Sequence, residues 1–386
     1  MIQTILDNDF YKFTMQKATI NLFPHAIVKY QFINRGKTKF PDGFDKILLE
    51  NIKEMQALKL TKEEKQFLRS RCYFLDPAYI DFLAGYRFDA DEVSVNQQDG
   101  DLSVFIEGYW YRTILWEVPL MALISELYFH ITGEPILPEN VIQENADQKM
   151  KFYQSLNVRV SDFGTRRRYS YHNHDKIIQT LKNYAPNTFL GTSNVHFAQK
   201  YDVSPMGTQA HEWFMFHAAK YGFKMATQFA LEHWIDIYRG DLGIALSDTF
   251  TSDLFFKHFD TKFAKLFDGV RHDSGDPILF ANKTISHYKK LGIDPTTKAI
   301  VFSDSLVPEK VKEIRDFCNG KIRISFGIGT NFTNDVGVTP LNIVIKMVAA
   351  KPEGCNWVNT IKLSDSETKY TGDPATIELC KRVINT

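Results

Sequence analysis

From about residue 155 onward, short β-rich runs recur along the chain, and each ends in a small group of polar residues. Four of these groups begin at Asp248, Asp273, Asp304 and Gly327, at intervals of 25, 31 and 23 residues. These intervals match one strand-helix unit in a barrel of roughly 250 residues. Because most runs are followed by a helical stretch, we expect parallel strands whose carboxyl ends share one active face. The pattern predicts an α/β fold, an irregular TIM-like barrel, although a doubly wound open sheet would also place polar loops there.

The first part of the chain has mixed helix and strand signals. Apolar residues recur at helical spacing over 44–58, and Thr61 followed by Glu64 predicts a capping box. Alternating runs on both sides of Asp99-Gly100 predict a hairpin, and 115–130 predicts an apolar helix that bridges two domains. The expected division is an amino-terminal α+β domain at 1–130, a barrel domain at 131–366, and a segment at 367–386 that packs back on the first domain.

Composition excludes several classes of function. Forty-six basic residues balance forty-six acidic ones, so we expect no broad affinity for nucleic acid or anionic membranes. The four cysteines are scattered without metal or redox spacing, which favours a reducing compartment. We find no basic-then-apolar leader and no stretch that we expect to span a bilayer. The sequence therefore predicts a soluble, cytoplasmic protein.

The nine residues 269–277, Gly-Val-Arg-His-Asp-Ser-Gly-Asp-Pro, suit a phosphorylated, metal-bearing sugar. Arg271 offers a planar fork of donors to phosphate. Asp273 and Asp276 are hard oxygen ligands for Mg²⁺ or partners for ribose hydroxyls, and Gly275 allows close backbone approach. The same letters also make a good surface turn, so the motif alone leaves both interpretations open.

Three further motifs are ambiguous when each is taken alone. Consecutive arginines at 166–168 require at least one anionic partner, although Arg167 and Arg168 could lie on a solvated edge. His211 is either a hydrogen-bonded core residue or a catalytic one, because no second histidine follows at the spacing of a zinc protease. His172 and His174 alternate like strand residues, and we expect them to be exposed to solvent.

Taken together and in order, the motifs resemble those of the bacterial nicotinate phosphoribosyltransferase family. The motifs that carry the resemblance are residues 7–12, 162–168, 191–194, 205–214, 269–277, 302–304, 325–330 and 362–366. They cover nearly the whole chain. The resemblance implies that nicotinate and 5-phosphoribosyl 1-pyrophosphate give nicotinate mononucleotide and pyrophosphate, driven by ATP hydrolysis, in NAD salvage. It also implies Mg²⁺, an irregular α/β barrel joined to an α+β domain, and homodimers with shared active sites.

The resemblance also assigns roles to residues that bind the phosphoribosyl substrate and ATP. Arg271 would hold the pyrophosphate or phosphate, and Asp273 would hold ribose hydroxyls or, with Asp276, the metal. His211 would be phosphorylated by ATP, as a phosphohistidine beside the pyrophosphate site. The ribose 5-phosphate would lie in a cradle whose expected members are Ser303, Asp304, Gly327, Gly329 and Thr330. The segment from Gly327 to Thr330 lacks the third glycine of a dinucleotide-binding fingerprint.

For the pyridine ring, the resemblance implies stacking and charge recognition. Phe163 would stack on the ring and Arg166 would bind its carboxylate, while Tyr11 of the partner subunit could close the other face. Thr192 and Ser193 would also contact substrate.

Three alternatives remain from the sequence. The related nicotinamide enzyme has an Asp after its Gly-Thr pair, where this chain has Ser193, which favours the acid as substrate. A non-catalytic barrel that binds a phosphorylated ligand would not need His211 together with Arg271 and Asp273. An isomerase or aldolase would use Lys346 or Lys362, but a structural role explains either lysine more simply.

Overall fold

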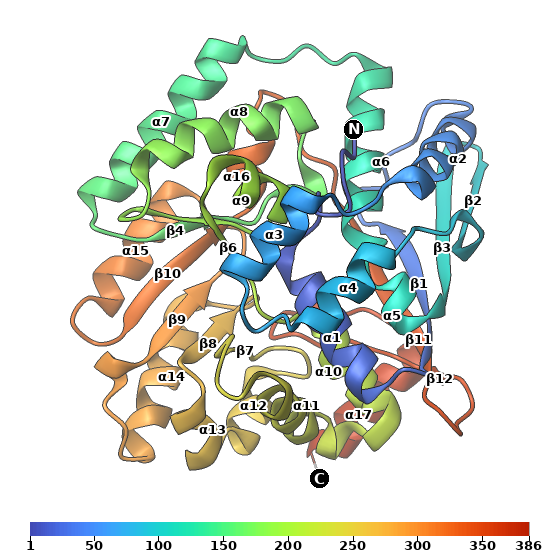
Figure 1. Cartoon of the computed structure of the whole chain (residues 1–386). Coiled ribbons are helices and arrows are strands. Elements are labelled where there is room, and N and C mark those ends of the chain that lie inside the picture. The colour runs from blue at the N-terminus through green and yellow to red at the C-terminus, as the bar shows by residue number, and fades with distance from the viewer. Residues whose placement is uncertain (386) are drawn as a thin grey trace.

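The computed structural model describes residues 1–385, and its strands form two separate sheets (Figure 1). The first sheet is antiparallel, with strand order β12-β11-β1-β3-β2. Its strands are β1 (Ile27–Asn34), β2 (Val93–Gln98), β3 (Asp101–Tyr109), β11 (Ile343–Lys351) and β12 (Val358–Asn359). The predicted hairpin is confirmed, because β2 and β3 pair from Val93 opposite Ile106 to Gln98 opposite Asp101.

The second sheet is parallel throughout, with strand order β6-β5-β4-β10-β9-β8-β7. Its strands are β4 (Val160–Asp162), β5 (Phe189–Thr192), β6 (Ser204–Pro205), β7 (Ile244–Leu246), β8 (Gly269–His272), β9 (Ala299–Phe302) and β10 (Arg323–Ile328). It is a curled half-barrel with helices along its outside (Figure 1). The predicted α/β class, with parallel strands in one unit and a mixed unit beside it, is confirmed.

Helices cover both sheets. The longer ones before the parallel sheet are α1 (Phe10–Leu22), α2 (Phe44–Glu54), α3 (Lys62–Arg71), α4 (Pro77–Gly85), α5 (Trp110–Thr113), α6 (Glu117–Thr132) and α7 (Glu139–Ser155). Those that follow are α8 (Tyr171–Leu181), α9 (Val195–Tyr201), α10 (His211–Tyr221), α11 (Phe223–Tyr238), α12 (Ser252–His258), α13 (Thr261–Leu266), α14 (Pro277–Lys290), α15 (Pro308–Cys318), α16 (Thr330–Thr333) and α17 (Pro374–Asn385).

Local sequence signals account for several helix starts. Thr61 accepts from the Glu64 backbone while the Glu64 side chain accepts from the Thr61 backbone, so the predicted capping box is confirmed. Asp276 caps α14, and Pro277 occupies its first position, where the missing N–H costs nothing. Pro119 lies in the first turn of α6, where a proline is tolerated.

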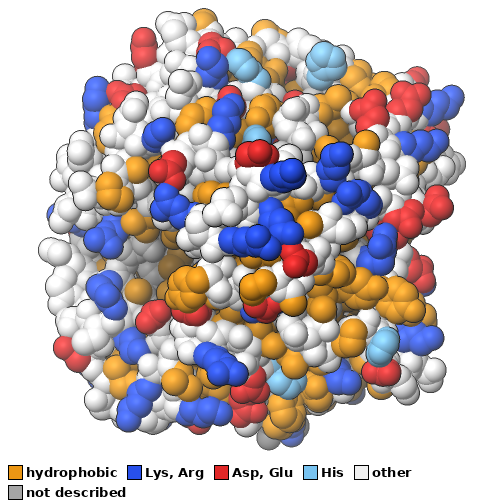
Figure 2. Space-filling view, viewed as in Figure 1, with side chains coloured by type: hydrophobic (Ala, Val, Ile, Leu, Met, Phe, Trp, Pro, Cys, Tyr) orange, Lys and Arg blue, Asp and Glu red, His pale blue; other side chains and the backbone are white. Residues whose placement is uncertain are grey.

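The apolar helix α6 lies between the two sheets, since it packs against β11 and against the short 3₁₀ helix η3 (Thr165–Arg167). Contrary to expectation, the segment Trp110–Thr132 is long and apolar enough to span a membrane by length and composition. However, 78% of its most apolar window is buried inside the protein, as in a core helix. On the face in Figure 2, basic and acidic side chains are intermingled, in line with zero net charge.

Two local expectations are wrong. His172 and His174 lie on α8 rather than on a strand, and His174 is fully buried, with its Nε2 2.8 Å from Asp162 Oδ2. Alternation over three residues does not distinguish a strand from one turn of helix. The domain boundaries remain a prediction, but β11 pairs with β1, so the chain returns to the amino-terminal sheet well before residue 367. The last helix, α17, packs against α11.

Candidate functional site

A cavity of about 750 Å³ is lined by residues from both sheets and from α10. The antiparallel sheet contributes β11, with Lys346 facing the cavity. The parallel sheet contributes residues at the carboxyl ends of its strands, including Arg271, Asp273, Ser303 and Asp304. The prediction that the polar groups at successive strand ends would meet on one face is confirmed by this arrangement.

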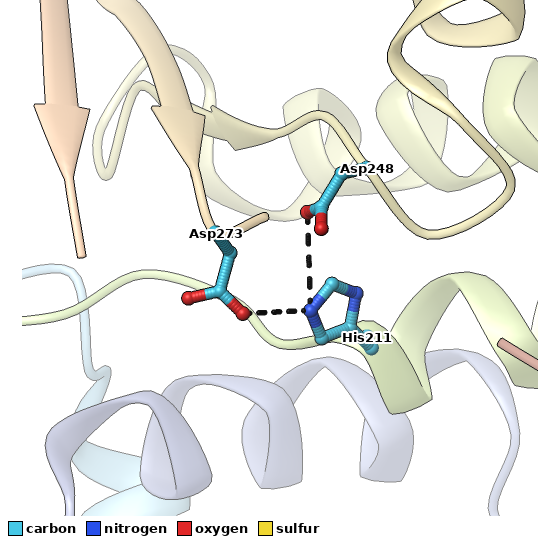
Figure 3. Close-up of side chains that lie close together, drawn as sticks. All are labelled: His211, Asp248 and Asp273. Atoms are coloured by element: carbon cyan, nitrogen blue, oxygen red, sulfur yellow. Dashed lines mark hydrogen bonds and ion pairs between the residues drawn. The ribbon is translucent and has the colours of Figure 1, made fainter. Parts of the chain in front are cut away.

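His211 is the first residue of α10, and its ring lies between two carboxylates (Figure 3). Its Nε2 is 3.0 Å from Asp273 Oδ2 and 3.9 Å from Asp248 Oδ1, while its Nδ1 is 3.0 Å from Thr249 Oγ1. Asp273 follows β8 and Asp248 follows β7, so adjacent strands aim both acids at one ring. Phe23, which follows α1, packs on Trp213 and Phe216 and so helps to fix α10.

The pKa values in this cluster shift because of burial and neighbouring charges. Burial, and then repulsion from Lys362, lowers the pKa of His211 to about 4, so the imidazole is neutral at pH 7. Burial alone would raise the pKa of Asp273, but Arg271 and His211 hold it well below its ordinary value. A neutral imidazole oriented by an ionised carboxylate can act as a nucleophile.

Arg271 is held in place by a network of polar partners. Its Nε donates to Ser303 Oγ at 2.9 Å, one terminal nitrogen donates to Asp273 Oδ1 at 3.0 Å, and the other donates to the Gln209 carbonyl at 3.3 Å. Ser303 also donates to Asp273, at 2.8 Å. A guanidinium that is fixed in this way is preorganised for a phosphate in the cavity.

Asp248 has an oxygen that lacks a protein partner. Its Oδ2 accepts from Ser274 and lies 3.7 Å from Lys362 Nζ, but its Oδ1 is buried without a hydrogen bond among the described residues. One ligand atom each from His211, Asp248 and Asp273 lies within 4.8 Å of the others. A buried carboxylate with an oxygen that lacks a hydrogen bond, beside the half-buried Asp273, fits a hard cation such as Mg²⁺.

Arg166 lies at the other side of the cavity, where it faces a buried chain of charges. Its Nη1 is 3.6 Å from Glu117 Oε1, and Glu117 also pairs with Lys12 at 2.6 Å. Lys12 is fully buried and pairs at 2.9 Å with Glu212, which is next to His211 in the sequence. This series of ion pairs links both Arg166 and the start of α10 to Lys12 of α1.

Tyr11 and Phe163 line the same cavity as Arg166. Tyr11 comes from this chain's own α1, whereas the sequence suggested the partner subunit as its source. Phe163 follows β4, and its ring fills the space beside Gly327, where a Cβ atom would lie 2.2 Å from the ring. Gly327 therefore leaves room for Phe163, and its role toward a phosphate stays a prediction, while Gly329 and Thr330 line the cavity itself.

The three consecutive arginines have different surroundings. Arg168 is fully buried and makes a bidentate pair with Asp7, at 2.7 and 2.9 Å. Arg166 faces Glu117, as described above. Arg167 lines the cavity, and among residues 1–385 no ion pair or side-chain hydrogen bond of its guanidinium is found. Neither Arg167 nor Arg168 therefore lies on the solvated edge that the sequence allowed.

Besides Gly327, three predicted site residues lie away from the cavity lining. Thr192 donates to Asp162 at 2.6 Å and Ser193 donates to Asp9 at 2.7 Å, and both are buried. Asp276 accepts from the Ile278 and Leu279 backbones at the start of α14. The structure thus uses these polar groups in internal hydrogen bonds, and their roles toward substrate or metal stay predictions.

Sequence reasoning missed the roles of Asp248, next to His211, and of two lysines that line the cavity. Asp248 was noted only as a polar residue at a strand end, and Lys346 and Lys362 were given structural roles. Burial lowers the pKa of Lys346 to about 8. The signal for Asp248 was present, because it is the second residue after β7, much as Asp273 is the first residue after β8.

Comparison with known proteins covers the whole chain. The model of the nicotinate phosphoribosyltransferase (NAPRTase) family matches residues 158–386, and the model of its N-terminal domain matches residues 6–125. A nicotinate phosphoribosyltransferase from Chromohalobacter salexigens is 57% identical over 384 residues, covering 100% of this chain and 98% of the relative. One from Desulforapulum autotrophicum is 52% identical over 386 residues, with 100% and 99% coverage.

Solved structures agree with the sequence comparison. The crystal structure of nicotinate phosphoribosyltransferase from Porphyromonas gingivalis matches with a TM-score of 0.97 and 44% identity, covering 100% of both chains. That of a putative nicotinate phosphoribosyltransferase from Saccharomyces cerevisiae matches with a TM-score of 0.93 and 34% identity, covering 100% of this chain and 98% of the other. From the site's geometry and these matches, the chain belongs to the nicotinate phosphoribosyltransferase family.

Proposed function

We propose that the cavity joins nicotinate to 5-phosphoribosyl 1-pyrophosphate, and that His211 couples the reaction to ATP hydrolysis. The family membership gives the reaction, which forms nicotinate mononucleotide and pyrophosphate for NAD biosynthesis. The observation that supports the coupling is a buried, neutral His211 held between Asp273 and Asp248 in the same cavity as Arg271.

The chemistry of bond formation explains the cavity's composition. The ring nitrogen of nicotinate carries a free lone pair, so its attack on the anomeric carbon requires no general base. Catalysis then depends on aligning the reactants and stabilising the departing pyrophosphate. Arg271, already oriented by Ser303 and Asp273, is placed to hold that leaving group.

Recognition of nicotinate falls to the side of the cavity that contains Phe163 and Tyr11. The two aromatic rings supply apolar faces for a flat pyridine, and Arg166 supplies a cation for its carboxylate. Ser303, Asp304 and the segment Gly329-Thr330, which line the same cavity, would hold the ribose 5-phosphate.

Phosphorylation of His211 would use the imidazole as an acceptor for the terminal phosphoryl group of ATP. Asp273 holds the ring in one orientation, and a low pKa keeps the ring unprotonated for attack. Mg²⁺, held by Asp248 and Asp273, would neutralise charge on the polyphosphate groups.

The homodimer and the cytoplasmic location are also proposals. Four free cysteines, three of them buried, suit a reducing compartment. Tyr11 of this chain lines its own cavity, so a dimer would not be needed to supply that side chain.

The test is nucleotide formation with and without ATP, with nicotinamide as a parallel substrate. We expect product from nicotinate that rises with ATP, and we expect His211→Ala to keep slow turnover that no longer responds to ATP. Undiminished ATP stimulation in that variant would contradict the role of His211. A preference for nicotinamide would favour the related nicotinamide enzyme, and no product from either pyridine would favour a non-catalytic barrel.

A further inference from the structure

Two arginines of the cavity lining, one from each sheet, lack an acidic partner. Arg35 directly follows β1 of the antiparallel sheet, and Arg167 ends the 3₁₀ turn after β4 of the parallel sheet. Within residues 1–385, no ion pair of either side chain is found, and Arg35 donates only to Thr371 Oγ1, at 3.2 Å.

The acids nearby are already engaged by other cations. Asp304 pairs with Lys369, and Asp273 pairs with Arg271 and His211. Glu117 lies between Lys12 and Arg166. Asp273 and Asp304 therefore act on Arg167 only from beyond ion-pair distance, and neither arginine has an acid of its own among residues 1–385.

The electrostatic cost of this arrangement is visible in the arginines themselves. Burial, followed by repulsion from Arg166 and Arg35, lowers the pKa of Arg167 to about 10. Burial also lowers the pKa of Arg35. Partly buried like charges without a counter-ion are unfavourable unless an anion binds between them.

We propose that Arg35 and Arg167 form an anion subsite that binds a phosphate group and connects the two sheets through it. A guanidinium binds phosphate through two parallel N–H donors, which suits a ligand shared by two arginines. Because the arginines come from different sheets, the bound phosphate would hold the antiparallel sheet against the half-barrel. The subsite is additional to Arg271 and to the segment Gly329-Thr330.

This inference rests on the proposed function for its ligands, since both 5-phosphoribosyl 1-pyrophosphate and ATP carry phosphate groups. Either compound could place a phosphate between the arginines. Binding measurements with each compound separately, and with inorganic tripolyphosphate, distinguish these two sources.

The experiment compares Arg35→Gln and Arg167→Gln with the wild-type protein by isothermal titration. Arg69→Gln is the matched control, because it removes the same charge from an exposed pair with Asp81 on α3 and α4. Arg167→Lys tests whether the fork or only the charge matters. Losing a charge-assisted hydrogen bond should weaken at least one phosphate ligand tenfold or more, while nicotinate affinity changes less than twofold.

Each outcome bears on the proposal. Weaker binding of the phosphoribosyl substrate alone assigns the subsite to that substrate, and weaker binding of ATP and tripolyphosphate alone assigns it to ATP. If Arg35→Gln and Arg167→Gln bound every phosphate compound within twofold of wild type, as we expect for Arg69→Gln, the subsite would be overturned. Normal turnover by the wild-type protein in that case would leave the proposed function intact. A wild-type protein that formed no nucleotide and bound no phosphate compound would overturn both.

Discussion

The buried polar network and the wall of the cavity differ in whether their charged side chains have partners within the protein. Behind the cavity, Arg168 pairs with Asp7 and His174 pairs with Asp162, with all four side chains fully buried. On the wall, Arg35 and Arg167 have no acid of their own. The charges inside the fold are therefore paired within the chain, whereas these two wall arginines are the ones for which we propose an anionic ligand as the partner.

The largest effect should come from breaking a satisfied pair. Arg168→Ala leaves the Asp7 carboxylate buried without its bidentate partner, so we expect the free energy of unfolding to fall by about 3–5 kcal/mol. Arg69→Ala, whose pair with Asp81 is exposed, should cost about 0–1 kcal/mol. Urea denaturation of both variants measures the difference, and similar losses would remove the contrast between the two regions.

A cavity arginine should affect turnover more than folding. Arg271→Ala removes a preorganised donor, so kcat/KM for nucleotide formation should fall by about 10²–10³-fold. Arg271→Lys keeps the charge but loses the planar fork, and should recover only part of this loss. Steady-state kinetics checks both variants, and a loss below about tenfold for the alanine variant would rule out a direct role in holding the leaving group.

The pH dependence of stability should sharpen the comparison further. The pKa of His211 lies at about 4 in the folded protein against an ordinary 6.5, so the unfolded chain binds the proton first as pH falls. The contribution of the neutral His211 to the free energy of unfolding is therefore complete above pH 6.5. It is lost as the pH falls from 6.5 to 4, at about 1.4 kcal/mol per pH unit.

The test compares wild type with His211→Gln in urea at several pH values between 7 and 4.5. The variant should lose less stability than wild type as the pH falls, because it lacks this group. Parallel curves would show that His211 is not buried as a neutral ring.

The smallest expected effect is a gain in the free energy of unfolding, on replacing Lys346. Lys346 is mostly buried in the cavity wall with no ion pair found among residues 1–385, and burial lowers its pKa to about 8. Lys346→Met should raise the free energy of unfolding by about 1 kcal/mol while weakening anionic substrates. Thermal unfolding with and without substrate checks this, and a destabilised variant would mean that Lys346 serves the fold.

Elements that depend on local signals were predictable from sequence. The capping box of Thr61 with Glu64 and the hairpin around Asp99-Gly100 are present as expected, because a few neighbouring residues specify each of them. The position of β11 was not predictable, since it depends on pairing Ile27 with Lys351 across most of the chain.

For the site, the residue types were informative but their directions were not. Arg271, Asp273 and His211 were expected together and lie within one network. Thr192 ends β5 and Ser193 follows it, as the cavity residues end or follow their strands, yet the two side chains turn toward Asp162 and Asp9. Which way a side chain points after a strand depends on the loop's dihedral angles, and residue spacing carries no information about them.

The pairing of β1 with β11 has a consequence for how the protein is made. During synthesis, β1 and β3 emerge early, but the neighbour on the other edge of β1 follows only after the half-barrel strands. Until β11 arrives, that edge carries unpaired backbone groups and could pair with another chain. A nascent chain stalled after β10 would thus be prone to aggregation and would lack one wall of the cavity.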